Sequence, residues 1–176
     1  MPRKVVKRTP EEDRRYHDTW KLLKKYRDVV WSMELSVHQI QGEFQIEYGS
    51  SSVEDFLDAA SLAGADLSGT DIEQRARSIE RSNKMINLVR SAVDLLRHRH
   101  KNGETYYWIL YYTYLIPQQL DSIADIIEQL RPHIRDISRR TYFNRREDAV
   151  EALSSILWGY SAKDSIKLLN EMIPED

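Results

Sequence analysis

Apolar residues recur at a spacing of seven along two stretches of the chain, which predicts two long amphipathic helices. The first is expected from Pro10 to about Gln41. Its start carries a capping box, because Thr9 can cap, Pro10 suits the first helical position and Glu12 can reach back to the cap. Its apolar stripe consists of Tyr16, Leu23, Val30, Val37 and Phe44. Residues 42–48 alternate in polarity and suit either a continued helix or a short strand.

The second long helix is expected to follow a capping box at Thr70–Glu73 and to end at Asn102–Gly103. Its apolar stripe consists of Ile72, Ile79, Ile86 and Val93. A second stripe on each helix is polar in its middle: Arg27, Glu34 and Gln41 on the first, and Asn83, Arg90 and Arg97 on the second. The simplest arrangement is an antiparallel, coiled-coil-like hairpin within one chain. The alternative is a homodimer in which a second copy completes the seam.

Shorter elements follow. A dense aromatic helix is expected over residues 106–115, ending before Pro117. Asp121 or Ser122 then caps a helix over residues 123–130 with an isoleucine-rich buried face, and Ser138 caps a helix from Arg139 to about Trp158. Two further short helices are expected over residues 53–62 and 161–173.

These elements predict an all-α fold, in which a long helical hairpin precedes a small helix-turn-helix bundle. The expected parts are a basic flexible tail (1–9), a long-helix hairpin or oligomerisation region (10–103), and a helix-turn-helix DNA-binding domain with a C-terminal helix (104–176).

Composition narrows the class of protein. Hydrophobic residues make up 41% and charged residues 31% of the chain, and no apolar stretch is long enough to span a bilayer. The absence of cysteine excludes disulfides and thiolate metal sites, and it suits a cytoplasmic protein. Neither a secretory signal nor a membrane partner is expected.

Local charge is more informative than the net charge of -2. Six arginines lie between Arg131 and Arg146, with Asp136 as the one acidic residue among them. A basic island on an otherwise acidic chain is typical of a nucleic-acid contact. The other interpretation is a solvated helix face.

Four of these six arginines lie in the first turns of the helix that Ser138 is expected to cap. A helix-turn-helix needs a short braced helix, a turn, and a second helix whose donor-rich N-terminal half enters the major groove. Arginine can bind guanine or phosphate with two hydrogen bonds, and asparagine can pair with adenine. Residues 143–146 are expected to face largely outward. The candidate DNA-binding residues are Arg135, Ser138, Arg139, Arg140, Thr141, Asn144, Arg145 and Arg146.

A family resemblance supports this interpretation. Ile123-Ala-Asp-Ile-Ile127 with Ile137-Ser-Arg-Arg-Thr-Tyr142 resembles the second and third helices of the region-4-like domain of sigma-70 factors. Residues 142–159 resemble phage late-gene activators of the ArpU/RinA kind. The resemblance implies a phage or mobile-element transcriptional regulator that binds double-stranded DNA and could contact RNA polymerase. The connector over residues 131–137 is longer than the family's tight turn, so the resemblance does not fix the angle between the helices.

An enzyme, a cofactor and a metal site are not expected. His98 and His100 are two residues apart on a helix and point to different sides, and no phosphate-binding glycine loop or nucleophile motif is present. Two alternatives to a regulator stay open. One is the DNA-recognition subunit of a packaging assembly, like a small terminase, and the other is a helical adaptor or inhibitor without DNA binding.

Overall fold

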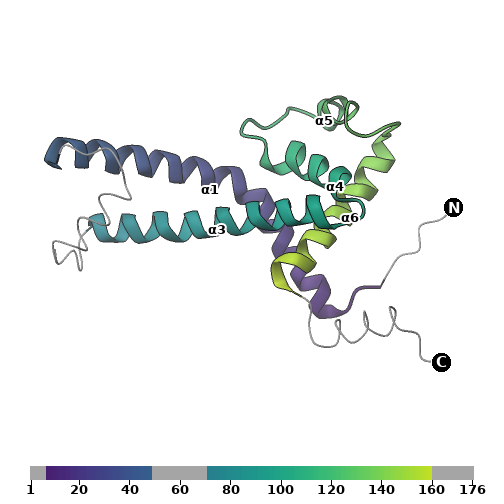
Figure 1. Cartoon of the computed structure of the whole chain (residues 1–176), viewed down its shortest axis with the longest axis horizontal. Helices are drawn as coiled ribbons and strands as arrows, with labels where there is room; N and C mark the ends of the chain where they lie inside the picture. Colours follow the sequence, from purple (N-terminus) through teal and green to yellow (C-terminus); the bar gives the residue numbers. More distant parts are fainter. Residues whose placement is uncertain (1–6, 49–70, 160–176) are drawn as a thin grey trace. The chain divides into compact units, whose positions relative to one another are not determined.

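The computed structural model describes residues 7–48 and 71–159, and all regular structure in these ranges is helical. The all-α class is therefore confirmed. Figure 1 shows the elements, which are α1 (Pro10–Tyr48), α3 (Asp71–Arg99), α4 (Gly103–Leu110), the π-helix η1 (Tyr111–Leu115), α5 (Ile123–Leu130) and α6 (Arg139–Trp158). The helices expected over residues 53–62 and 161–173 lie outside the described residues.

Helix α1 begins with the predicted capping box. The backbone N–H of Thr9 donates to Oε2 of Glu12 at 2.7 Å, and the N–H of Glu12 donates to Oγ1 of Thr9 at 3.2 Å. These two bonds satisfy donors that a helix start leaves without intrahelical partners. The helix continues to Tyr48, so residues 42–48 are helix rather than strand.

The chain forms two compact units. One comprises Lys25–Leu88, and the other combines Met1–Lys24 with Val89–Asp176. In the first unit, Tyr26, Ile79 and Ile86 are buried. The two isoleucines belong to the predicted stripe of the second long helix, which supports its phase. The antiparallel hairpin and the homodimer alternative stay predictions.

The second unit has a core built by α4, α5 and α6, with Tyr142 at its centre. The buried cluster consists of Ile109, Ile126, Leu130, Ile137 and Tyr142. The Tyr142 side chain is fully buried, and its hydroxyl lies 2.9 Å from Oγ1 of Thr113. That hydrogen bond satisfies the one polar atom of the ring in the core. Ala149, Val150 and Leu153 continue the buried side of α6.

Gly103 joins α3 to α4 in a turn that has no room for a side chain. A Cβ atom at this position would overlap the carbonyl oxygens of Leu96 and Arg97. The turn is closed by the N–H of Gly103, which donates to the carbonyl of His100 at 2.9 Å. The glycine that the sequence marks as a helix end therefore also permits a close backbone approach.

The aromatic run forms an α-helix that changes to a π-helix, a feature the sequence pattern does not predict. The N–H of Ile116 donates to the carbonyl of Tyr111 at 2.7 Å, which is the wider π spacing. This segment places Tyr114 in the interior, where burial raises the pKa of its phenol to about 12 and keeps it neutral. As predicted, the helical run ends before Pro117.

The start of α1 packs on the end of α6 in this same unit. The indole N–H of Trp158 donates to Oγ1 of Thr19 at 2.9 Å, and that hydroxyl donates to the carbonyl of Arg15 at 2.8 Å. Thr19 is fully buried. Residues 139 positions apart in the sequence are thus held together by a partly buried hydrogen bond.

The side chain of Leu153 is fully buried in the core, so truncating it should lower the stability of the fold substantially. Leu153→Ala should lower the free energy of unfolding by about 2–5 kcal/mol, since it removes buried apolar surface and leaves a cavity. Denaturation in urea measures this change. The control is Leu88→Ala, because Leu88 is 54% exposed and its loss should cost less than about 0.5 kcal/mol. Equal effects of the two substitutions would contradict the placement of the core.

Candidate nucleic-acid interface

Helices α5 and α6 both begin at serine caps. Oγ of Ser122 accepts the N–H of Asp125 at 3.1 Å, and Oγ of Ser138 accepts the N–H of Thr141 at 3.1 Å. The sequence predicted Ser138 as the cap of α6. For α5 it left two candidates for the cap, Asp121 and Ser122. Both helices begin and end where their apolar patterns predicted. Capping is typically worth about 1 kcal/mol per helix and fixes where the arginine-rich turn begins.

The connector between the two helices is anchored at several points. Ile137 is buried and Ile134 packs against the same core cluster. Asp136 adopts a left-handed backbone with φ of 54°, which a short polar residue tolerates better than a branched one. The imidazole of His133 stacks on the indole of Trp108, with ring centroids 3.7 Å apart and planes 15° from parallel. The connector is longer than a tight turn but is braced against α4.

The aromatic residues of α4 are held by their own polar network. The indole N–H of Trp108 donates to Oε2 of Glu104 at 3.1 Å, and Arg97 forms an ion pair with Oε1 of Glu104 at 2.7 Å. The Arg97 guanidinium also lies 4.1 Å from the ring centre of Tyr107. The side-chain hydrogen bond from Arg97 is the main reason that the pKa of Glu104 lies below its ordinary value. This network orients the indole on which His133 stacks.

Four of the candidate arginines are exposed. Arg139 and Arg140 occupy the first turn of α6, Arg145 lies in its second turn, and Arg135 in the connector has a side chain that is 97% exposed. The nearest acid to Arg135 is Asp136, at 3.9 Å across a fully solvated pair, which contributes little binding energy. These four cations are therefore accessible to an anionic partner.

Residues 143–146 do not all face outward, which corrects the expectation from the sequence. Phe143 is half-buried because its ring packs against the core cluster, and Asn144 and Arg146 are half-buried as well. Arg145 alone of these residues is exposed. The guanidinium of Arg146 lies 4.9 Å from the ring centre of Phe143, and that of Arg139 lies 5.6 Å from the same ring. Phe143 thus supports two of the arginines by cation–π contact.

The hydroxyl groups among the candidates take part in the cap. Oγ of Ser138 and Oγ1 of Thr141 are 2.9 Å apart, and Ser138 also accepts the Thr141 N–H. Ser138 is exposed and Thr141 is half-buried. All eight candidate residues lie within residues 135–146. They differ in how many of their hydrogen-bond donors already have a partner within the chain.

The middle of α6 is acidic, and the N-terminal segment supplies its counter-charge. Nη2 of Arg8 lies 3.1 Å from Oε1 of Glu147, and Nε lies 3.5 Å from Oε1 of Glu151, an ion-pair distance without hydrogen-bond geometry. The guanidinium also lies 3.9 Å from the ring centre of Tyr16. Burial lowers the pKa of Arg8, but Glu151, Tyr16 and Glu147 together outweigh it, so the net shift of the pKa is upward. The sequence offered no local signal for this contact.

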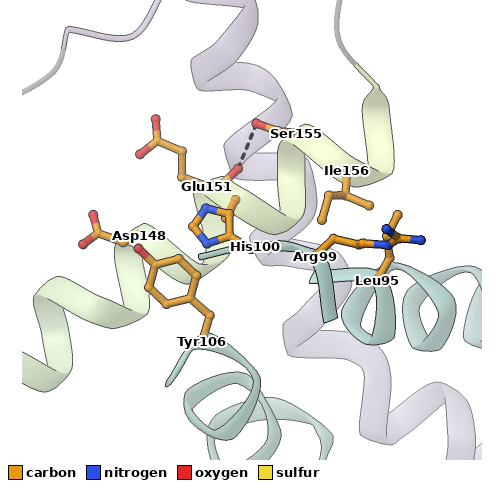
Figure 2. A pocket seen from close by; sticks show the side chains of 9 residues that line it. Leu95, Arg99, His100, Tyr106, Asp148, Glu151, Ser155 and Ile156 are labelled. Atoms are coloured by element: carbon orange, nitrogen blue, oxygen red, sulfur yellow. Dashed lines mark hydrogen bonds between the residues drawn. The ribbon is translucent and has the colours of Figure 1, made fainter. Parts of the chain in front are cut away.

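A pocket of about 550 Å³ lies beside the acidic part of α6 (Figure 2). His100 lies between the carboxylates of Asp148 and Glu151 on one side and Arg99 on the other, while the ring of Tyr106 lies tilted against its imidazole, with centroids 5.0 Å apart. Burial, and then the charge of Lys101, lower the pKa of His100. Among the described residues, no group of three His, Cys, Asp or Glu side chains is arranged to hold a metal ion.

Comparison with known proteins assigns neither a family nor a function to the chain. No protein-family model, curated protein or solved structure matches the chain. None of the helices in the described ranges is both long enough and apolar enough to cross a membrane.

The lowered pKa of His100 predicts a pH dependence of stability. The folded chain binds this proton more weakly than the unfolded chain does, so the contribution is complete above the ordinary pKa of 6.5 and is lost as pH falls toward the folded value. His100→Gln should make the loss of stability below pH 6.5 less steep. Thermal melts across this range measure the slope, with the exposed His98→Gln as control. Unchanged slopes in the His100 variant would contradict the burial of its imidazole.

Proposed function

We propose that the chain is a sequence-specific DNA-binding transcriptional regulator, in which α5 and α6 act as a helix-turn-helix and α6 is the recognition helix. The observation that carries the proposal is the contrast in exposure among the side chains of α6. Tyr142, Ala149 and Leu153 are buried in the core, while Arg139, Arg140 and Arg145 are exposed. A helix held by its apolar side, with arginines on its first two turns, suits entry into a major groove.

The surroundings of each arginine suggest different contacts. Arg139 and Arg140 lie nearest the N-terminus of α6, the part that enters deepest into the groove, so we assign base contacts to this pair, with Thr141 beside them. Arg145 is placed for a phosphate. Arg146 is held over Phe143 and has less freedom to reorient, which suits a fixed backbone contact. Arg135 in the connector adds a solvated cation for the opposite strand or a neighbouring phosphate.

The residues that support α6 are fixed by packing and hydrogen bonds, which favours sequence-specific DNA recognition over non-specific electrostatic attraction. A recognition helix must be held close to its productive geometry by residues that are themselves fixed. The core ring of Tyr142 and the stacked pair of His133 and Trp108 provide such support from two sides. The sigma-70-like and ArpU/RinA-like motifs support a phage or mobile-element regulator. Contact with RNA polymerase and homodimer formation are further predictions of that resemblance.

Alanine substitutions of the α6 arginines separate base contacts from phosphate contacts. Arg139→Ala or Arg140→Ala should cost about 1–3 kcal/mol on the preferred duplex and relax the preference at one base position. Arg145→Ala or Arg146→Ala should weaken preferred and scrambled duplexes alike and reduce the salt slope by about one. The measurement is duplex binding at several salt concentrations, after selection of the preferred site from a random library.

Arg81→Ala is the matched control for this series, because Arg81 is an exposed arginine on a different helix, α3. It should bind both duplexes like the parent. If all four α6 variants also behave like the parent, the arginine cluster is a solvated helix face and the proposal is wrong. A helical adaptor without DNA binding would then be the better interpretation.

A further inference from the structure

Helix α6 carries opposite charges in successive turns. Its first two turns hold four arginines, and the turns that follow hold Glu147, Asp148 and Glu151. Because an α-helix rises about 1.5 Å per residue, Glu147 and Arg145 are separated by about 3 Å along the axis. This is well within the Debye length of about 8 Å at physiological ionic strength. Uncompensated carboxylates here would repel the same phosphates that the arginines attract.

Arg8 lies against these carboxylates. Its guanidinium forms ion pairs with Glu147 and Glu151, which are four residues apart and therefore on the same side of α6. Tyr16 covers the guanidinium from another side, and the Arg8 side chain is only 18% exposed. A cation that is largely covered by protein is poorly placed to touch DNA itself. Asp13 of α1 also lies 3.9 Å from the guanidinium, but the carboxylates that it pairs with on α6 itself are Glu147 and Glu151, so its effect on a ligand of α6 passes mainly through these two.

We propose that Arg8 is a positioning residue of the DNA interface, which neutralises Glu147 and Glu151 and thereby removes their repulsion of the DNA backbone. This inference rests on the proposed function of α6. It assigns the segment before α1 a role in the interface that the sequence did not indicate. It also explains why a recognition helix can carry carboxylates one turn after its arginines.

The proposal differs from two simpler roles in what it predicts for charge and salt. If Arg8 only stabilises the fold, its substitution changes the melting temperature but leaves the affinity of the folded protein unchanged. If Arg8 binds a phosphate directly, its loss weakens binding whether or not the glutamates are charged. If it acts through the glutamates, its loss has no effect once they are neutral.

The experiment is a cycle of variants in the full chain, with binding to a short mixed-sequence duplex measured at several salt concentrations. Arg8→Gln should weaken binding about two- to fivefold at low salt, and the difference should shrink as salt rises. Arg8→Lys, which keeps the charge, should bind nearly as the parent does. In the background Glu147→Gln with Glu151→Gln, adding Arg8→Gln should leave the affinity unchanged. Thermal melts of each variant establish that the folded state is being compared.

Four results would overturn the inference. An undiminished effect of Arg8→Gln in the neutral background would make Arg8 a direct phosphate contact. Equal losses of affinity in Arg8→Gln and Arg8→Lys that do not depend on salt would mean that Arg8 acts on the interface through its packing and not through its charge. Parent-like binding by Arg8→Gln, with binding lost in Arg139→Ala and Arg140→Ala, would reject this inference and leave the proposed function standing. Failure of the parent to bind any duplex would reject both. If Arg8→Gln alone does not fold, the neutral background with and without it still gives the comparison.

Discussion

One buried ring, that of Tyr142, sets the phase of α6 about its own axis. The side chain lies in the first turn of the helix, is fully buried among Ile109, Ile126 and Leu130, and has its hydroxyl bonded to Thr113. Rotation of α6 would expose this apolar surface and leave the hydroxyl without its partner, and either change is costly. With the ring fixed, Arg140, two residues before it, is directed to the other side of the helix, and both Arg139 and Arg140 are exposed. The proposed recognition surface is therefore a consequence of how the core is packed.

The angle at which α6 leaves the connector depends on a second group of contacts. Ile137 is buried and His133 stacks on Trp108, so both ends of the connector are attached to α4 and α5. Trp108 is in turn oriented by Glu104 and Arg97. A long turn between two helices usually permits a range of angles, but stacking and burial at successive positions restrict it. The connector is longer than a tight turn, but the stacking of His133 on Trp108 of α4 restricts its conformation.

Much of the local structure could be predicted from the sequence, because it depends on residues close together in the chain. The capping box at Thr9, the cap at Ser138, and the bounds of α5 and α6 are all set within a few residues, and the cap of α5 could be narrowed to Asp121 or Ser122. The half-buried position of Phe143 could not be predicted in this way. An aromatic residue next to Tyr142 lies off the main stripe of the helix, and only the core partners from α4 and α5 show that it packs inward.

The π-helix was beyond sequence reasoning for a related reason. Every position from Tyr106 to Leu115 suits an α-helix about equally well, so nothing in the pattern marks where the hydrogen-bond spacing widens. The π-helix is favoured by tertiary packing, because it places the side chain of Tyr114 in the protein interior. Arg8 is the extreme case, since its partner Glu147 lies 139 residues away. No local period or motif connects a basic residue in a tail to an acidic residue in a distant helix.

The contacts of Arg8 and Thr19 make the start of α1 part of the same unit as α6. Thr19 bonds to Trp158 at the end of α6, and Arg8 pairs with Glu147 near its middle, so the helix is held from one side along much of its length. A fragment that begins at residue 104 would lose both contacts. It would also leave Glu147 and Glu151 without Arg8, and on the proposed function it would weaken DNA binding for reasons unrelated to the arginines of α6. The proposed interface therefore depends on residues far apart in the sequence, although every side chain assigned to touch DNA lies between Arg135 and Arg146.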